Sequence, residues 1–139
     1  MKVFVDTNVL IDFICNRESF YEDAEMIFSY GFANKLDIYF TDISVINTLY
    51  VGRKYNYTHE ELTEQLLSTI DYCQLALING SVMLNALSSD WNDKEDATQY
   101  FSALESCVDV IITRNVKDYA FAEIEVLTPV EFCTKYLEL

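Results

Sequence analysis

The chain has 139 residues, 51% hydrophobic and 23% charged, and these values predict a single globular domain over residues 1–139 with an ordinary apolar core. Its formal net charge of −14 argues against a protein that simply coats RNA or DNA, because such proteins are usually basic. Only 3 Gly and 1 Pro leave little room for linkers, and no apolar stretch nears the roughly 20 residues of a membrane helix.

The N-terminus and the lack of a membrane helix predict a cytoplasmic protein, in which a disulfide framework is not expected. The four cysteines are widely spread, without a CxxC pair or a histidine at ligand spacing, so we interpret them as small core residues. The N-terminus lacks a basic region, and Asp6 interrupts what would be the apolar segment of a signal peptide.

Apolar runs and helical stripes alternate along the chain. The expected strands cover residues 2–5, 36–41, 74–78, 109–113 and 125–127. The expected helices cover residues 8–15, 20–33, 43–54, 58–71, 81–87, 93–106 and a final segment from 129. Two of these helices begin with capping boxes, at Thr58 and at Thr128.

This alternation predicts an α/β fold with a central parallel sheet of about four to five strands and helices on both faces. Connections of this kind are nearly always right-handed, so the carboxyl ends of the strands share one edge of the molecule. We expect that edge to bring together Asp6, the region of Thr41 and the region of Arg114.

Asp6 directly follows the first strand, at the end where open α/β sheets place their chemistry. The structural alternative is a helix-capping carboxylate, which is worth about 1 kcal/mol. Thr7 and Asn8 could cap the same helix, so a third polar residue there favours a functional role for Asp6.

Asp96 lies in the first turn of its predicted helix, three residues after the expected N-cap Asp93. An acid at this position also offsets the helix dipole, which is the alternative interpretation. The apolar stripe that begins at Ala97 places Asp96 at the edge of the buried face, whereas Glu95 points roughly 100° away.

Asn115 and Asp118 follow the strand over 109–113, and both are candidate site residues that bind a metal or hold its water. For Asp118, a turn or cap acid is the alternative. Carboxylates at strand ends, without a glycine-rich phosphate loop, indicate a divalent-metal site rather than a nucleotide site.

Three segments resemble the motifs of the PIN-domain family: FVDTNVL at residues 4–10, DKEDATQYFSA at 93–103 and DVIITRNVKDY at 109–119. Their order and spacing both fit, and the resemblance covers essentially the whole chain. It implies a parallel sheet flanked by helices. Many PIN domains are Mg²⁺- or Mn²⁺-dependent ribonucleases, including the VapC toxins of bacterial toxin–antitoxin pairs.

The resemblance also implies site roles. Asp6 matches the first acidic position and Asp96 the third, while the fourth falls on Asn115 or Asp118. The second position, usually Glu, falls on Asn47, whose amide oxygen can bind a metal but brings no charge and cannot act as a base. We therefore expect weaker metal binding than in a four-acid site.

The implied reaction is hydrolysis of an RNA phosphodiester bond by a metal-activated water. The expected metal ligands are Asp6, Asp96 and Asp118, and Asn47 and Asn115 would orient water or the scissile phosphate. Thr113 matches a small hydroxyl residue beside the site. Cations expected near the substrate are Arg114, Lys117, Arg53 and Lys54, although such residues are also common at helix ends.

Two other functions remain open. The first is a catalytically inactive PIN-like module that binds protein or RNA, which Asn47 and the net charge favour. The second is another phosphate-handling α/β enzyme, but Asn8 stands where a haloacid-dehalogenase-type phosphatase has its second aspartate, and no P-loop is present.

The expected partners are an RNA substrate, an antitoxin protein and a second copy of the chain, since PIN toxins dimerise and are held inactive by antitoxins. No membrane partner is expected. Five tyrosines could present an aromatic surface to a partner or a base: Tyr39, Tyr50, Tyr55, Tyr57 and Tyr119.

Overall fold

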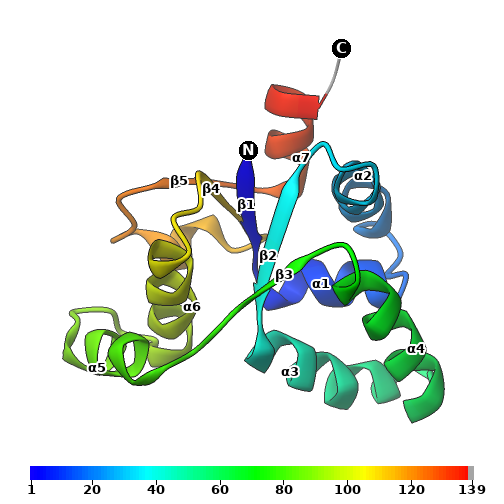
Figure 1. Cartoon of the computed structure of the whole chain (residues 1–139), viewed down its shortest axis with the longest axis horizontal. Coiled ribbons are helices and arrows are strands. Elements are labelled where there is room, and N and C mark those ends of the chain that lie inside the picture. The colour runs from blue at the N-terminus through cyan, green and yellow to red at the C-terminus, as the bar shows by residue number, and fades with distance from the viewer. Residues whose placement is uncertain (138–139) are drawn as a thin grey trace.

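The computed structural model describes residues 1–137, in which strands and helices alternate as predicted (Figure 1). The strands are β1 (Lys2–Val5), β2 (Asp37–Thr41), β3 (Gln74–Ala76), β4 (Val110–Ile112) and β5 (Glu125–Leu127). The helices are α1 (Thr7–Ile14), α2 (Tyr21–Phe32), α3 (Asp42–Gly52), α4 (His59–Ile70), α5 (Gly80–Ser88), α6 (Lys94–Glu105) and α7 (Pro129–Phe132). Short 3-10 turns follow α3 (Arg53–Tyr55) and β4 (Val116–Tyr119), and a π-helical turn (Cys133–Leu137) continues α7.

The strands form one parallel sheet in the order β3-β2-β1-β4-β5. Val3 of β1 lies opposite Ile38 in β2 and Val110 in β4, so β1 is the central strand. The chain builds outward from β1 on one side and then crosses to the other side with β4. Sites in open α/β sheets lie at such a switch point, which here is the gap between the ends of β1 and β4.

The two faces of the sheet bury separate apolar clusters, because successive side chains of a strand point to opposite faces. Val3 and Val5 pack with side chains of α1, α2, α4 and α7. Phe4 packs on the other face with Trp91 and with α6. All three strand residues are fully buried, each contributing about 1.5–3 kcal/mol, and this confirms the buried first strand.

Reciprocal capping boxes start α4 and α7, as predicted. The Thr58 hydroxyl accepts from the Glu61 N–H at 3.1 Å, and the Glu61 carboxylate accepts from the Thr58 N–H at 2.9 Å. Thr128 and Glu131 repeat this arrangement with the same two distances. Each box satisfies two backbone donors that would otherwise lack partners.

The strand ends are tied together at the predicted edge of the sheet. The Asp6 N–H donates to the carbonyl of Ile112 at 2.9 Å, and the Thr113 N–H donates to the carbonyl of Leu127 at 3.0 Å. The first residues after β1 and β4 are therefore held by hydrogen bonds of the sheet, which fix the backbone positions of Asp6 and Thr113.

Three of the four cysteines are buried, but the prediction of a core position is wrong for Cys107, which is exposed. Cys107 lies in the turn after α6 with a φ of 58°, and this turn runs over the surface rather than into the core. No helix within residues 1–137 is long and apolar enough to cross a membrane.

Candidate active site

Asp6 is the most firmly held acid of the site. It is buried at 6% exposure, and its Oδ2 accepts from the Thr113 hydroxyl at 2.8 Å while its Oδ1 accepts from the Thr7 N–H at 2.8 Å. The Asn8 amide donates to the same Oδ2 at 3.5 Å. Burial raises the pKa of Asp6, and the bonds from Thr113 and Thr7 partly offset that rise. Asp6 thus caps α1 and also faces the site.

Asp96 carries the clearest electrostatic signal. It lies in the first turn of α6, where Asp93 accepts from the N–H groups of Glu95 and Asp96 at 2.8 and 3.0 Å. The pKa of Asp96 is raised to about 7, first by burial and then by the negative charges of its neighbours, which in decreasing order of effect are Asp93, Asp6, Asp118 and Glu95. Acids from three separate segments are therefore close enough to repel one another.

A cleft of about 240 Å³ brings Asp93 and Asp96 together with Lys117 and Asp118. Trp91 and Phe121 form part of its wall. Asn115 does not line this cleft; it is exposed and borders a different pocket. Of the two residues that the sequence left unseparated, the structure therefore places Asp118 beside Asp96.

Tyr119 belongs to the site rather than to an aromatic surface, which corrects the prediction for that residue. It is 3% exposed and packs edge-on against Trp91, with ring centroids 5.5 Å apart. Its hydroxyl lies beside Asp6 but makes no hydrogen bond of normal geometry. Burial and the charges of Asp6 and Asp96 raise the pKa of Tyr119 well above its ordinary value, so the hydroxyl stays protonated.

Asn47 reaches the site through Glu95. Its amide nitrogen donates to the Glu95 Oε1 at 3.3 Å, linking α3 to the first turn of α6. Glu95 also raises the pKa values of Asp6 and Asp96, so it lies closer to them than its helical angle suggests. The sequence signal for Glu95 was its position next to Asp96 in an acidic turn.

A buried polar cluster joins the three helices that carry these residues. Gln99 of α6 donates from Nε2 to the hydroxyls of Thr7 at 3.1 Å and Ser44 at 3.2 Å. Those two hydroxyls are 2.6 Å apart, and Thr41 donates to Ser44 at 3.0 Å. The cluster fixes the starts of α1 and α3 against α6, and no sequence pattern identified it.

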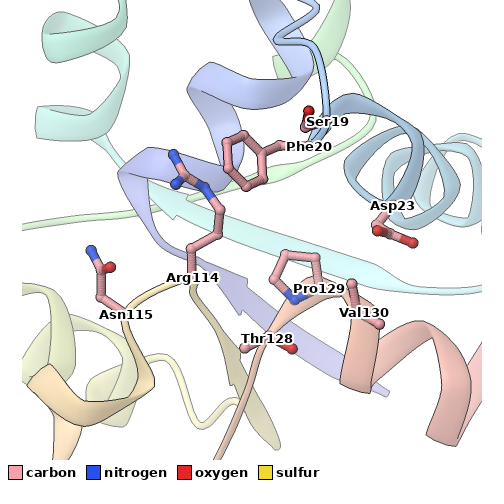
Figure 2. A pocket seen from close by; sticks show the side chains of 8 residues that line it. All are labelled: Ser19, Phe20, Asp23, Arg114, Asn115, Thr128, Pro129 and Val130. Carbon is pink, nitrogen blue, oxygen red and sulfur yellow. The ribbon is translucent and has the colours of Figure 1, made fainter.

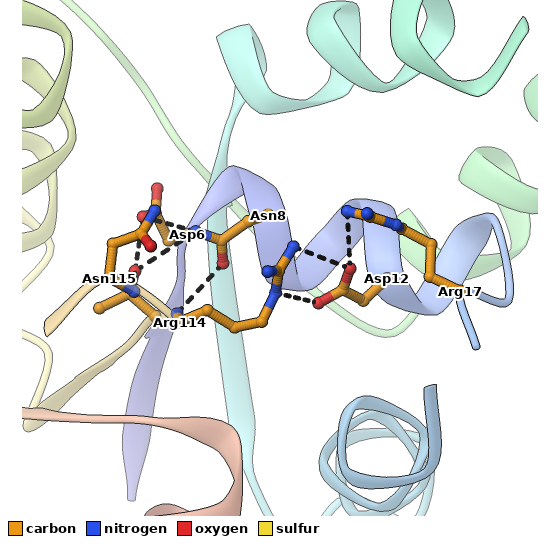
Figure 3. A network of polar contacts seen from close by, with 7 residues as sticks. Asp6, Asn8, Asp12, Arg17, Arg114 and Asn115 are labelled. Carbon is orange, nitrogen blue, oxygen red and sulfur yellow. Dashed lines mark hydrogen bonds and ion pairs between the residues drawn. The ribbon is translucent and has the colours of Figure 1, made fainter. Parts of the chain in front are cut away.

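The Arg114 side chain points away from the candidate site acids Asp6 and Asp96, contrary to its expected contact with a substrate phosphate there. Its Nε donates to Asp12 at 2.7 Å and its Nη2 donates to the same carboxylate at 3.3 Å (Figure 3). Arg17 forms a further ion pair with Asp12 at 3.4 Å. The Asp12 side chain is 1% exposed, and burial raises its pKa although Arg114 partly offsets the rise. Arg114 is therefore held on the α1 side of the sheet.

The backbone of Arg114 nevertheless connects this ion pair to the site. The Arg114 N–H donates to the Asn8 side chain at 3.3 Å (Figure 3). The Asn115 N–H donates to the Thr113 hydroxyl at 3.1 Å. Arg53 and Lys54 lie apart from the site. They follow the far end of α3, whose 11 residues span about 16 Å, so a contact near the acids is not supported.

The residues suit a divalent cation in chemical type but are not assembled as a closed set of ligands. Carboxylate and amide oxygens are what Mg²⁺ and Mn²⁺ prefer, and a cation would offset the negative charges that, together with the larger effect of burial, raise the pKa of Asp96. Within residues 1–137, however, no three His, Cys, Asp or Glu side chains converge closely enough to hold an ion.

Comparisons with known proteins find a matching family and a similar protein. A family model described as PIN domain matches residues 2–117. Ribonuclease VapC1 from Aquifex aeolicus (strain VF5) is 28% identical over 140 residues, covering 97% of this chain and 95% of that protein.

Two solved structures have the same fold. The toxin–antitoxin complex from Klebsiella pneumoniae gives a TM-score of 0.63 at 24% identity, covering 91% of this chain and 97% of that chain. The structure of FitAcB from Neisseria gonorrhoeae gives a TM-score of 0.65 at 19% identity, covering 92% of this chain and 98% of that chain.

Proposed function

The chain belongs to the PIN domain family, and from this membership we propose that it is a metal-dependent endoribonuclease acting as the toxin of a toxin–antitoxin pair. A relative named as a ribonuclease and a similar structure named as a toxin–antitoxin complex support the proposal. The observation that carries it is the placement of buried Asp6 beside Asp96, at the switch point of the sheet.

In this function Asp6, Asp96 and Asp118 would hold Mg²⁺ or Mn²⁺. The bound ion would activate a water and neutralise charge developing on the cleaved phosphate. Thr113 and the Thr7 N–H each occupy one Asp6 oxygen, so that carboxylate keeps a single orientation. Oδ1 accepts only the Thr7 bond among these, so its second lone pair can face the site, while Oδ2 also accepts from Asn8.

The neighbouring polar groups would position substrate and water. Lys117 is the cation of the Asp96 cleft and would contact a flanking phosphate. Asn47 would orient water or the scissile phosphate from the rim of the site, where Glu95 holds it. The protonated Tyr119 hydroxyl would donate a hydrogen bond rather than act as a base.

Calorimetric titration with Mn²⁺, together with cleavage of a labelled random-sequence RNA pool, tests this function. We expect Asp6→Asn and Asp96→Asn to abolish Mn²⁺ binding and to slow cleavage by about 100-fold or more, because each removes a charged ligand. Asp71→Asn changes an exposed acid at the end of α4 and should leave both measurements unchanged. Full cleavage by both site variants would rule the proposal out.

A catalytically inactive binding module is the second candidate, and two observations favour it. Asn47 brings no charge to the position that, by the family resemblance, usually holds Glu, and the acids within residues 1–137 do not converge as a ready ligand set. This candidate predicts no Mn²⁺ binding by the unmodified protein up to millimolar metal, together with intact RNA in the same assay.

The proposed partners follow from the same function. An antitoxin is supported by the similar toxin–antitoxin complex, and a basic segment would suit a chain of net charge −14. A homodimer is supported by large exposed apolar side chains on α3 and α5, which include Ile46, Tyr50, Leu84 and Leu87.

A further inference from the structure

A second pocket lies on the other side of the loop that carries Arg114 and Asn115. This Phe20 pocket has a volume of about 360 Å³ and is lined by Phe20, Asp23, Arg114, Asn115, Pro129 and Val130 (Figure 2). Its residues come from the start of α2 and from the segments that follow β4 and β5. It therefore opens at the same edge of the sheet as Asp6.

The Phe20 pocket is within reach of a nucleotide bound at the candidate active site. Arg114 and Asn115 directly follow Thr113, whose hydroxyl donates to Asp6 at 2.8 Å. Two residues of chain span at most about 7 Å. An RNA strand whose phosphate lies at Asp6 can therefore place an adjacent base in the Phe20 pocket.

The wall of the pocket offers flat groups suited to stacking. The Arg114 guanidinium carbon lies 4.0 Å from the centroid of the Phe20 ring, and the two bonds to Asp12 fix its orientation. Phe20 remains 38% exposed, and Pro129 supplies a buried apolar surface nearby (Figure 2). Aromatic rings and guanidinium planes are the groups on which unpaired RNA bases stack.

The polar lining indicates which base fits. None of the ion pairs within residues 1–137 uses the Asp23 carboxylate, although it borders the pocket. A carboxylate repels phosphate and accepts hydrogen bonds only, so a base that binds beside it must present N–H donors. Guanine presents two adjacent donors, N1–H and the N2 amino group, which match the two carboxylate oxygens, whereas uracil presents one.

We propose that the Phe20 pocket binds the base of the nucleotide next to the cleaved phosphodiester, and that Asp23 makes it selective for guanine. The proposal rests on the ribonuclease function for the identity of its substrate. The pocket itself contains none of the acids assigned to metal binding, so base binding and cleavage can be measured separately.

The test titrates GMP, AMP, CMP and UMP into the protein with EDTA present and follows backbone amide shifts by NMR. We expect GMP to bind at least fivefold more tightly than UMP, with shifts at Phe20, Asp23 and Asn115. Asp23→Asn should reduce the preference for GMP over UMP to below twofold, and Phe20→Leu should weaken the binding of all four nucleotides. Asp71→Asn is the matched control and should bind as the unmodified protein does.

The outcomes separate the pocket from the nuclease function. Equal binding of the four nucleotides, binding outside the pocket, or an unchanged preference in Asp23→Asn would overturn the proposal even if RNA is cleaved. GMP binding in the pocket by Asp6→Asn, which should not cleave, would support the pocket independently of catalysis. In the cleavage assay, a preference for cleavage next to guanine that is lost in Asp23→Asn would give further support.

Discussion

Asp96 is a site residue whose negative charge reduces the stability of the folded protein. Its folded-state pKa of about 7 lies above the ordinary value of 3.8, so the folded protein holds a proton that the unfolded chain releases. The stability associated with this group is fully present below about pH 4 and is lost as pH rises through about 7. The metal-free protein should therefore become less stable across this range.

Replacing Asp96 with Asn should stabilise the metal-free protein, because the amide keeps the shape and removes the repelled charge. We expect the gain in Tm to be small at pH 4, to grow up to about pH 7 and then to level off. Thermal unfolding in EDTA at pH 4, 6 and 8 measures it, with Asp71→Asn for comparison. A lower Tm for Asp96→Asn at pH 8 would contradict the electrostatic account.

Site residues could be predicted from the sequence where a strand end places them. Asp6 and Thr113 follow buried strands, and parallel topology predicted that Asp6 meets the region of Arg114, while the family resemblance put Thr113 beside the site. Tyr119, Asp12 and Glu95 could not be recognised in this way. Their positions depend on a 3-10 turn and on which helix face meets the sheet, and neither leaves a local pattern in the sequence.

Replacement of two helix glycines by alanine should change the free energy of unfolding in opposite directions. A Cβ on Gly52, at the end of α3, would lie 2.5 Å from one methyl carbon of Leu62 and 2.8 Å from the other. Leu62 is fully buried in α4, so Gly52→Ala forces the two helices apart and should cost about 1–3 kcal/mol.

Gly80 is the matched control for that substitution. It opens α5 with no positive φ, and a Cβ added there would meet no atom within 4 Å. Gly80→Ala should raise the free energy of unfolding by about 0.4–1 kcal/mol, since alanine restricts the unfolded chain. Urea denaturation of both variants gives the comparison, and equal effects of the two substitutions would refute the packing argument.

Elements could be predicted where capping residues and periodicity agree. Thr58 and Thr128 marked two helix starts correctly, because a capping box uses only residues three apart. The turn over Val116–Tyr119 was missed because four residues are too few to show a period. That short turn is what carries Asp118 and Tyr119 to the site.

For the whole molecule, the exposed apolar side chains of α5 predict association. Leu84 and Leu87 are 68% and 59% exposed, and we expect a dimer of the 16.1 kDa chain through this helix. Leu84→Lys combined with Leu87→Lys should give a monomer in analytical ultracentrifugation. Phe32→Lys, at the end of α2 and 72% exposed, should leave the dimer intact. A monomeric unmodified protein at high micromolar concentration would exclude the dimer.

The central place of β1 has a consequence for how fast the site moves. Because β1 is paired on both sides, the amide protons around Asp6 should exchange with solvent only when the sheet itself opens. Asp118 lies on a short turn that can open locally without disturbing the sheet. The residence time of an ion bound by both Asp6 and Asp118 would depend on how often the turn opens. Its position would be fixed by Asp6, which lies beside the central strand.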